Sequence, residues 1–595
     1  MTALRIGALS LARAAGALAA LVVCLGLALP VAAQELRRPA PEAATPLGST
    51  PAAPVRAEDW MVVAAHPLAA ETGADILRQG GSAIDAMVAV QLVLGLVEPQ
   101  SSGLGGGAFL LYWDAAENKL TSLDGRETAP SAATPELFLD EDGEPLGFFD
   151  AVIGGRSVGV PGTPRLLEEA HRRWGRLAWA ELFQPAIFLA QEGFSPSPRL
   201  LALAGEAADS LSRQETAKTY FVDTLSAVVA AGDKLKNPAY AATLRTLAEE
   251  GADAFYEGAI AESIVAAIRR FDDNPGLMRL QDLAGYEVKE REPVCIAYRV
   301  YEVCGMGPPS SGGVAVGQIL GLLSPFDLAA LGHESAEAWR LIGDASRLAF
   351  ADRGRYLADT DFVPAPIKGL LDPDYLAARA ELLEGGTRLE QVTAGEPQWD
   401  HALHFAPGEA LELPSTSHFV IIDGAGNVVS MTTTIENGFG SRLMVRGFLL
   451  NNELTDFSFR THRDGVPVAN RVEPGKRPRS SMAPTIVFQD GEPVLALGSP
   501  GGSRIIPYVA KTLIAILDWG MDVQEAVALP HLVNRTGVYD VEAGTRAEDF
   551  IAALGLLGYE VNVRDLNSGL HALAIGPDGL SGGADPRREG IAIGR

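Results

Sequence analysis

The order of apolar and polar residues divides the chain into a helix-rich part and a sheet-rich part. The apolar stretch that begins at residue 61, "MVVAA", predicts a short strand, and the helix predicted after it ends at Gly80 and Gly81. A second predicted helix, over about 82–96, is apolar on all sides, which is typical of a buried helix. Ala- and Leu-rich helical stretches then alternate with short loops between about 160 and 400. Helices therefore dominate the first two-thirds of the chain.

The last third of the chain has the alternation that is typical of strands. Residues 418–435, "HFVIIDGAGNVVSMTTTI", predict two strands joined by a turn at 423–427. Further strand-like stretches follow, among them "APTIVF" and "PVLALG". Earlier in the chain, "IAYRVYEV" at 296–303 predicts two short strands around Tyr298 and Arg299. The C-terminal third is therefore predicted to be rich in sheet.

The N-terminus has the order of a cleavable secretory signal. Arg5 and Arg13 precede an apolar run over 14–29, and small residues follow, which predicts a signal peptide over 1–33 with cleavage after its last residue. The run is shorter than the roughly 20 residues that span a bilayer, which disfavours the alternative of an uncleaved membrane anchor. Residues 34–57, rich in Pro, Ala, Ser and Thr, are predicted to be a flexible N-terminus. We expect a periplasmic or secreted protein without a stable membrane anchor.

Composition and charge narrow the class of protein. A chain of 595 residues is long enough for two or more domains, and 47% hydrophobic and 21% charged residues are ordinary for a globular protein. The net charge of −27 and the pI near 4.8 would repel nucleic acid and anionic membranes over most of the surface. We therefore expect no nucleic-acid partner.

The cysteines leave two possibilities open. Removal of the signal takes Cys24 away and leaves only Cys295 and Cys304, in an oxidising compartment. They flank the strands predicted at 296–303, so they form either a disulfide or two buried free thiols. The helical middle of the chain offers no metal-ligand spacing, and the glycines at 103–107 lack the Lys-Ser/Thr that a phosphate loop requires. We expect neither a metal ion nor an organic cofactor.

Three small hydroxyl residues stand at the start of a predicted strand in "LPSTSHFVII", residues 413–422. They fit a polar loop that enters a sheet, and they also fit a nucleophile held at a strand. A threonine hydroxyl needs a base, and the α-amine of the same residue, with a pKa of roughly 7.7–8, is able to take and return a proton. That amine exists only if the Thr416 hydroxyl attacks the Ser415 carbonyl and cuts the chain there. Thr416 would then be the first residue of a new, smaller chain.

Several sequence blocks resemble the γ-glutamyltransferase family of N-terminal-nucleophile hydrolases. The likeness runs from about residue 61 to the C-terminus and includes "GGSAIDAMVAV", "EPQSSGLGGG" and, at 308–313, "PPSSGG". The most specific blocks are "TSHFVIIDGAGNVVSMTTTIENGFGS", "LLNNELTDFS", "GKRPRSSMAPTIV" and "GSPGGSRII". The occurrence of these blocks in this order makes coincidence remote.

The resemblance implies a fold and a division into two chains. The implied fold is of the α/β (α+β) class, a four-layer αββα sandwich of the N-terminal-nucleophile type. Autoproteolysis would give a large chain over 58–415 and a small catalytic chain over 416–595, which stay together as a heterodimer.

The resemblance also implies roles in catalysis. Thr416 is the implied nucleophile, and the Thr434 hydroxyl hydrogen-bonds and tunes it. The backbone N–H groups of Gly501 and Gly502 are the implied oxyanion hole, where the missing side chains let the substrate carbonyl approach. His418 follows the nucleophile by two residues, and we expect it to have a structural packing role rather than to act as a second base.

Two sets of residues are implied to bind the charged groups of an amino acid: Arg126, Ser480 and Ser481 the α-carboxylate, and Glu453 and Asp456 the α-ammonium. A bidentate guanidinium suits a carboxylate, and paired acids suit an ammonium. The chain departs from the family pattern at Glu436, where members often have Asn, and this adds a third carboxylate near the ammonium site. The segment between Asp456 and Ser480 is short and has no tyrosine, which predicts a reduced lid and an acyl-enzyme more open to water and to bulky acceptors.

The implied reaction moves a γ-glutamyl group from glutathione or a related γ-glutamyl compound to water or to an amino acid or peptide amine, through an ester on Thr416. One alternative is a cephalosporin or glutaryl-amide acylase of the same superfamily. A glutaryl group has no amine, so Glu436, Glu453 and Asp456 would be left as uncompensated acids. The other alternative is a non-catalytic periplasmic binding protein, which the intact pair Thr416 and Thr434 disfavours.

Overall fold

The computed structural model describes most of the chain, in the ranges 53–401, 404–408, 410–413 and 415–595. The predicted signal peptide and most of the predicted flexible N-terminus lie outside the described residues. No helix within the described ranges is long and apolar enough to cross a bilayer.

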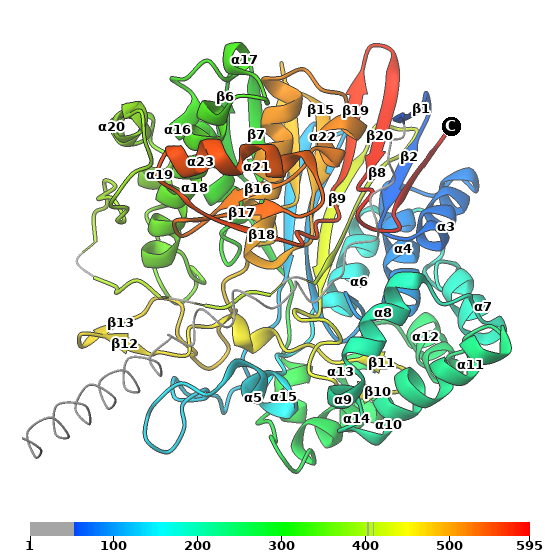
Figure 1. The fold of residues 1–595 in the computed structure, drawn as a ribbon. Helices are drawn as coiled ribbons and strands as arrows, with labels where there is room; N and C mark the ends of the chain where they lie inside the picture. Colours follow the sequence, from blue (N-terminus) through cyan, green and yellow to red (C-terminus); the bar gives the residue numbers. More distant parts are fainter. Residues whose placement is uncertain (1–52, 402–403, 409, 414) are drawn as a thin grey trace, which may run out of the picture.

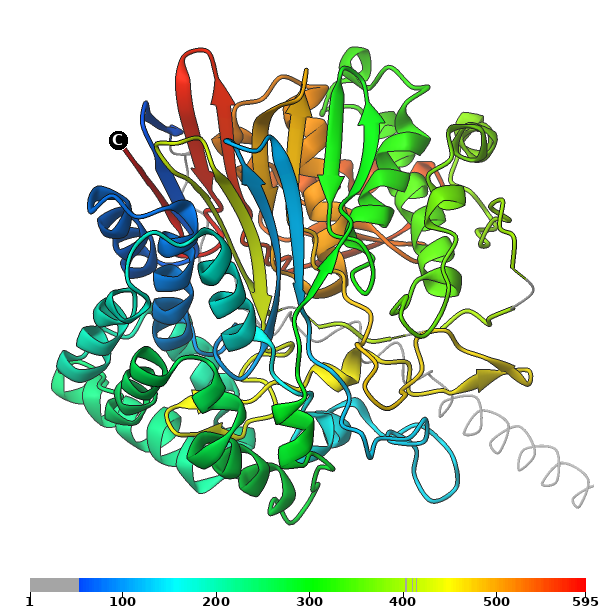
Figure 2. The ribbon, with the colours of Figure 1, turned by 180° about the vertical axis from the view of Figure 1, so that it is seen from behind.

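Two antiparallel sheets, each of seven strands, lie face to face in the middle of the described part of the molecule (Figures 1 and 2). The first sheet has the strand order β21 (Ile591–Gly594), β2 (Met61–Ala64), β8 (Ser417–Ile422), β9 (Val428–Thr434), β3 (Gly107–Asp114), β4 (Lys119–Gly125) and β5 (Lys289–Arg291). The second has the order β1 (Val55–Ala57), β20 (Gly579–Ala584), β19 (His571–Gly576), β15 (Glu492–Gly498), β14 (Thr485–Gln489), β7 (Tyr301–Gly305) and β6 (Val294–Tyr298). The strand pairs predicted around residues 423–427 and around Tyr298 are confirmed.

Apolar side chains fill the space between the two sheets. In β8, Val420 and Ile422 belong to this inter-sheet core, whereas Phe419 and Ile421 belong to the core under the helices. Side chains alternate between the two faces of a strand, so a strand that is covered on both faces needs an unbroken apolar run. This requirement explains why the last four residues of β8, "FVII", are all apolar.

Helices cover the outer face of each sheet (Figures 1 and 2). The helical layer of the first sheet contains α3 (Pro67–Arg78), α4 (Ala83–Val97), α6 (Thr163–Trp174), α7 (Gln184–Glu192), α8 (Pro198–Glu206), α12 (Pro238–Glu250) and α14 (Gly258–Arg269). The layer of the second sheet contains α16 (Gly312–Leu323), α18 (Ala336–Tyr356), α20 (Pro373–Ala380) and α21 (Ile505–Leu517). These layers confirm the predicted four-layer αββα sandwich.

The boundaries predicted for the first two helices are also confirmed. α3 ends at Arg78, just before Gly80 and Gly81. Ser82 caps α4: its Oγ accepts a hydrogen bond from the Asp85 N–H at 3.2 Å, and the Asp85 carboxylate accepts one from the Ser82 N–H at 2.8 Å. Every residue of α4 is buried, as its uniformly apolar surface predicts.

The predicted flexible N-terminus extends a few residues too far. Residues 55–57 form β1, which pairs with β20 at the edge of the second sheet. Ala57 is buried there in the inter-sheet core, together with Met61 and Leu580. A strand of three residues is too short to show a periodicity, so only its pairing with a distant strand reveals it.

Among the described residues, two strand pairs and one three-stranded sheet lie outside the two large sheets. They are the pairs β10 (Met444–Val445) with β11 (Phe448–Leu449) and β12 (His462–Arg463) with β13 (Val466–Pro467), and the small sheet of β16 (Leu532–Asn534), β17 (Val538–Glu542) and β18 (Glu560–Arg564). The β12–β13 hairpin belongs to the segment that we predict to be a reduced lid.

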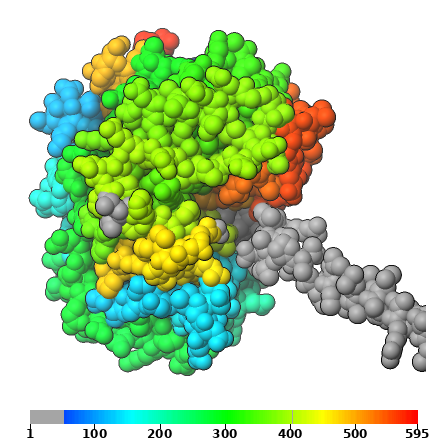
Figure 3. Space-filling view, turned by 90° about the vertical axis from the view of Figure 1, so that its left-hand side faces the viewer, coloured from blue at the N-terminus to red at the C-terminus, as the bar shows by residue number. Residues whose placement is uncertain are grey.

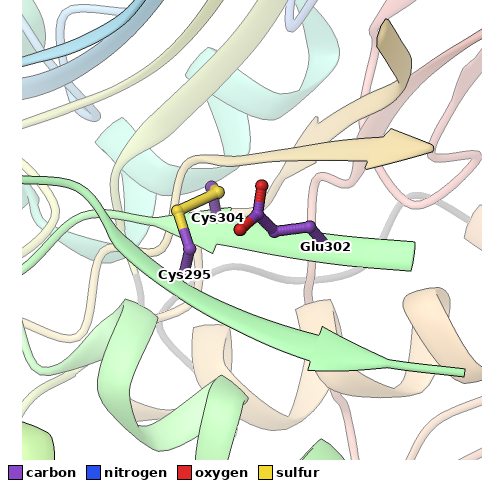
Figure 4. A group of neighbouring side chains, drawn as sticks. All are labelled: Cys295, Glu302 and Cys304. Carbon is purple, nitrogen blue, oxygen red and sulfur yellow. A yellow bond between two sulfur atoms is a disulfide. The ribbon is translucent and has the colours of Figure 1, made fainter. Parts of the chain in front are cut away.

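Cys295 and Cys304 are joined by a disulfide, with an S–S distance of 2.07 Å (Figure 4). The register of β6 and β7 places the two residues opposite each other. Of the two possibilities that the sequence leaves open, the structure has the bonded pair. Glu302 lies beside the sulfurs, but a disulfide supplies no thiolate, so this cluster lacks the chemistry of a metal site.

Strands from before and after the 415–416 peptide bond are interleaved in both sheets. In the first sheet, β2 from before the bond lies between β21 and β8 from after it. In the second sheet, β7 pairs with β14 and β1 pairs with β20, and each pair again joins the two parts of the chain. A cut at this bond would therefore leave both parts held in the same sheets.

Candidate active site

Thr416 stands immediately before β8, and the residue is only 4% exposed. Its φ of 94° lies in the left-handed region, which β-branched residues rarely adopt. Such a conformation costs roughly 1–3 kcal/mol and persists only where the surrounding structure imposes it. The backbone is therefore strained at the junction that the sequence predicts to be cut.

Thr434 is the last residue of β9, the strand that pairs with β8. Its Oγ1 is 3.0 Å from the Oγ1 of Thr416. The Glu436 N–H donates a hydrogen bond of 2.8 Å to the Thr434 Oγ1. Because Thr434 accepts this bond, its own hydroxyl hydrogen is free to point at the Thr416 oxygen. The strand register thus brings together the two threonines that the sequence singles out.

Gly501 and Gly502 lie on the turn between β15 and α21. The Gly501 N–H donates a hydrogen bond of 3.3 Å to the Ser415 carbonyl oxygen. The φ angles of the two glycines are 136° and 59°. An added Cβ would lie 2.8 Å from the Tyr508 ring at Gly501 and 2.7 Å from two backbone carbonyl oxygens at Gly502, so both positions need glycine. One donor of the predicted oxyanion pair thus contacts the carbonyl that the predicted self-cleavage would attack.

Two further contacts hold the peptide on either side of the junction. The Arg588 Nη1 donates a hydrogen bond of 2.8 Å to the Thr416 carbonyl oxygen. The Ser415 hydroxyl donates one of 3.0 Å to the Gln100 carbonyl oxygen. Sequence reasoning missed both partners: Gln100 lies within the block "EPQSSGLGGG", whereas Arg588 stands outside every quoted block.

A small cavity of about 20 Å³ lies beside Thr416. The predicted site residues that line it are Arg126, Thr416, Thr434, Glu436, Glu453, Asp456, Ser480, Ser481 and Gly502. The fold gathers them from distant parts of the chain, because Arg126 and Asp456 are 330 positions apart. Glu412 and Leu413, from the linker before the junction, line the cavity as well. The linker of the uncut chain therefore closes part of the site.

Arg126 is buried and forms ion pairs with two acids of this cavity. Its Nη1 contacts Glu453 and its Nη2 contacts Asp456. Its Nε and Nη2 also donate to the carbonyl oxygens of Pro478 and Arg479, both at 3.1 Å. Both Nη groups of Arg126 are therefore already paired in this conformation, so they are not free for the expected bidentate contact with a substrate carboxylate. An incoming carboxylate would have to compete with the two acids for the guanidinium.

The acids of the cavity are held close together. The pKa of Glu436 is raised well above its ordinary value, because the side chain is buried and because Asp456 and Glu453 lie nearby. Burial is also the main cause of the raised pKa of Asp456, and Arg126 opposes it. Glu127, which sequence reasoning missed, is a further buried acid whose pKa is raised by burial and by Glu453. These buried acids therefore favour their protonated forms, and a cation beside them would favour the ionised forms instead.

Ser481 binds a carboxylate in the uncut chain. Its Oγ donates a hydrogen bond to the Glu412 carboxylate, which also forms an ion pair with Arg353. The Arg353 Nη2 donates a further hydrogen bond of 2.7 Å to the Ser481 Oγ. The Ser480 Oγ instead accepts a hydrogen bond of 3.1 Å from the Met482 N–H. The cation beside Ser481 is therefore Arg353, which sequence reasoning did not identify.

His418 is fully buried between the sheets. Its Nδ1 is 2.9 Å from the Thr432 Oγ1, and its ring lies 6.4 Å from the ring of His571. Burial lowers its pKa well below the ordinary value, and His571 lowers it further. A Cβ on Gly498 would lie 2.3 Å from this ring, so the histidine is tightly enclosed. These surroundings support the expected packing role of His418.

Comparison with known proteins places the chain among recognised relatives. The sequence profile of the Gamma-glutamyltranspeptidase family matches residues 69–595. The chain is 39% identical over 550 residues to the glutathione hydrolase proenzyme of Bacillus subtilis strain 168, with 90% of this chain and 92% of the relative covered. It is 36% identical over 557 residues to the Acylase ACY 1 proenzyme of Pseudomonas sp. strain SE83, with 91% and 94% covered.

Two solved structures are similar as well. A cephalosporin acylase from Bacillus halodurans matches with a TM-score of 0.80 and 26% identity, over 93% of this chain and 98% of that chain. The gamma-glutamyltranspeptidase of Helicobacter pylori matches with a TM-score of 0.53 and 32% identity, over 58% and 97%. The profile match spans the blocks on which the resemblance rests, from α4 to the turn at Gly501. The predicted family and the predicted enzyme are thereby confirmed: the chain belongs to the gamma-glutamyltranspeptidase family.

Proposed function

We propose that the chain cuts itself between Ser415 and Thr416 and then uses Thr416 to cleave γ-glutamyl amides such as glutathione, passing the γ-glutamyl group to water or to an amine. The observation that carries this proposal is the cavity beside Thr416, which is lined by three buried acids, Glu436, Glu453 and Asp456, and by one guanidinium, that of Arg126. A ligand that brings an ammonium and a carboxylate together would suit these charges. The amino-acid end of a γ-glutamyl group is such a ligand.

The contacts at the junction support self-cleavage. The Thr416 Oγ1 attacks the Ser415 carbonyl carbon, the C–N bond between the two residues breaks, and the nitrogen takes up the proton of the hydroxyl. The resulting ester on Thr416 is then hydrolysed by water, which leaves a carboxylate on Ser415 and a free α-amine on Thr416. The Gly501 N–H, 3.3 Å from the Ser415 oxygen, stabilises the charge that develops there. The left-handed φ of Thr416 disappears with the bond, which favours the cut.

The same groups serve the later reaction. The new α-amine of Thr416, with a reference pKa of roughly 7.7–8, takes the hydroxyl proton during attack and returns it to the departing amine. Thr434, with its Oγ1 3.0 Å away, keeps the attacking oxygen oriented. The N–H groups of Gly501 and Gly502 face the oxyanion, and water or an acceptor amine then releases the γ-glutamyl group from the ester.

The charges of the cavity favour a γ-glutamyl substrate over a glutaryl one, although some relatives are named acylases. We expect kcat/KM for a γ-glutamyl anilide to exceed that for the matching glutaryl anilide by roughly 10²-fold or more, because a glutaryl group brings no ammonium to the three acids, of which Arg126 pairs with only Glu453 and Asp456. Parallel initial-rate measurements with the two anilides test this prediction. A preference for the glutaryl compound would mean that the enzyme is a glutaryl-amide acylase rather than a γ-glutamyltransferase.

Glu436→Gln should change the pH dependence of substrate binding. Burial and the neighbouring acids raise the pKa of Glu436, so the group is neutral at lower pH and becomes the carboxylate that an ammonium prefers as the pH rises. KM for a γ-glutamyl anilide should therefore fall with rising pH in the wild type. Gln is neutral at every pH, so the variant should lose this fall and have a KM roughly tenfold higher at about pH 8. Identical KM profiles for the two enzymes would show that Glu436 does not contact the ammonium.

The working unit that we propose is a heterodimer of 58–415 and 416–595, exported by a signal peptide over 1–33 to the periplasm or the exterior. The interleaved strands of the two sheets support the heterodimer. The disulfide between Cys295 and Cys304 supports an oxidising compartment. No step of the proposed reaction requires a metal ion or an organic cofactor.

A further inference from the structure

A cleft lined by arginines lies on the other side of the linker, the segment just before Ser415, from the cavity at Thr416. A cavity of about 330 Å³ is lined by four arginines, which define what we call the arginine cleft: Arg347, Arg353, Arg479 and Arg535. A second cavity, of about 740 Å³, shares Arg535 and adds Arg460, His462 and Arg463. Neither cavity has an Asp or Glu among its described lining residues.

The outer cavity opens under the β12–β13 hairpin. The hairpin segment lies beside the loop around residues 138–148 on the face shown in Figure 3, where the two are yellow-orange and cyan. Phe459 stacks on Phe138 with ring centroids 4.5 Å apart, and Arg460 pairs with Glu144 at 3.0 Å. The reduced lid thus forms a wall of this cavity.

The arginines of the cleft carry more positive charge than the neighbouring acids outside its lining neutralise. This is unusual on a chain whose net charge is −27. Arg479 donates to two backbone carbonyl oxygens, at 3.1 and 3.4 Å, and forms no salt bridge with an acid among the described residues, although Glu412 and Asp456 are near enough to act on its charge. Burial, followed by the charge of Arg353, lowers the pKa of Arg479 to about 9. Arg535 is 3.7 Å from Asp540, but Arg504 already binds that acid at 2.7 Å. An anion in the cleft would relieve this repulsion.

The linker shows which anion these arginines hold. Glu412 forms its ion pair with Arg353, and despite burial the charges of Arg353 and Arg479 keep the pKa of Glu412 below its ordinary value. A carboxylate is therefore already bound at the inner end of the cleft. Glu409, another acid of the linker, lies outside the described residues.

The cleft begins where the oxyanion turn ends. Ser503, which follows Gly502, lines the cleft, and the Arg535 Nη1 donates a hydrogen bond to its Oγ. Arg353 also lines the cleft, while its Nη2 contacts Ser481 in the cavity at Thr416. The linker residue Ala410 lines both outer cavities, so the linker is the wall between them and the cavity at Thr416. A substrate whose γ-glutamyl end fills that cavity would extend its amine side towards the arginines.

We propose that the arginine cleft binds carboxylate groups on the amine side of the substrate, those of the amino acid or peptide that leaves or that accepts the γ-glutamyl group. The inference rests on the proposed function and adds a substrate class to it: γ-glutamyl compounds and acceptors with acidic amine parts. An Arg-carboxylate contact is charge-assisted and often bidentate, so each added carboxylate strengthens binding.

Three donors that differ only on the amine side test this inference: γ-glutamylglycinamide with no carboxylate there, γ-glutamylglycine with one, and γ-glutamylaspartate with two. We expect kcat/KM to rise along the series, by roughly tenfold or more from the first to the last. The rise should shrink as salt is added, since these contacts are partly exposed. Glutamate release from all three at equal efficiency would overturn the inference and leave the proposed function standing. Release from none of them would overturn the proposed function itself.

Variants of Arg535 locate the effect. Arg535→Gln should lower the aspartate-to-glycinamide ratio of kcat/KM roughly fivefold or more, whereas Arg535→Lys, which keeps the charge, should retain most of it. Arg546→Gln is the matched control, because Arg546 pairs with Glu334 at an exposed position outside both cavities, and its ratio should equal that of the wild type. Conversion into two chains shows that each variant has folded. An unchanged ratio in folded Arg535→Gln would mean that the arginine cleft does not bind the carboxylates of the amine side. The salt dependence of kcat/KM in the wild type tests the same point without any variant.

Discussion

Thr416→Ala is expected to yield one uncut chain without activity. The substitution removes the hydroxyl that attacks the Ser415 carbonyl, so no α-amine is released at residue 416 and neither nucleophile nor base is present. The Gly501 N–H and the other contacts around the junction remain, so the chain should still fold. Denaturing electrophoresis with N-terminal sequencing, together with assay of glutamate release, measures both effects.

Thr416→Ser is the matched control. Serine keeps the hydroxyl but loses the γ-methyl that restricts the χ1 rotamer, so slower cutting and reduced turnover should survive. A Thr416→Ala chain that still separates into two bands between residues 415 and 416, and still releases glutamate, would mean that the nucleophile is another residue.

Arg126→Lys is expected to lower kcat/KM for γ-glutamyl donors by roughly 10²-fold while self-cleavage continues. One ammonium is unable to replace the two Nη groups that face Glu453 and Asp456, so one buried acid loses its cation. None of the contacts of Arg126 reaches the Ser415 carbonyl or the Thr416 hydroxyl, which is why the cut should remain. Steady-state kinetics and electrophoresis on the same preparation separate the two outcomes.

Arg477→Lys offers a comparison for the Arg126 variant. Arg477 is also buried and also pairs with an acid, Asp124, but it does not line the cavity at Thr416. Arg477→Lys should lower the free energy of unfolding but should not produce the loss in kcat/KM for γ-glutamyl donors that is expected of Arg126→Lys. Equal losses in the two variants would mean that Arg126 supports the fold rather than the substrate.

Much of the candidate active site was predictable because it lies on strands with clear patterns. Thr416 directly precedes β8 and Thr434 ends β9, and the pattern of these paired strands is visible in "HFVIIDGAGNVVSMTTTI". Gly501 and Gly502 were identified by a motif, and the structure adds the physical reason, since each Cβ would collide with neighbouring atoms. Local patterns and motifs therefore located the proposed nucleophile, its partner hydroxyl and the proposed oxyanion donors.

The missed residues are polar side chains whose roles depend on distant contacts. Arg353 and Arg355 are two positions apart in "ADRGRY" on α18, and both could belong to a solvated helix face. Only the packing of α18 decides that Arg353 is buried against Ser481 and Glu412. The resemblance likewise named Arg126 but not its partners, because residue types in a motif do not specify which charges pair.

The interleaving of strands across the 415–416 bond has a consequence for the lifetime of the mature enzyme. While the chain is intact, the covalent linker keeps β2 and β8 at a high effective concentration, so pairing them is an intramolecular step. After the proposed cut, the same pairing in an unfolded molecule would require two separate chains to meet. The uncut chain is thus the form that is equipped to fold, and the persistence of the mature enzyme depends on how slowly it unfolds rather than on an equilibrium.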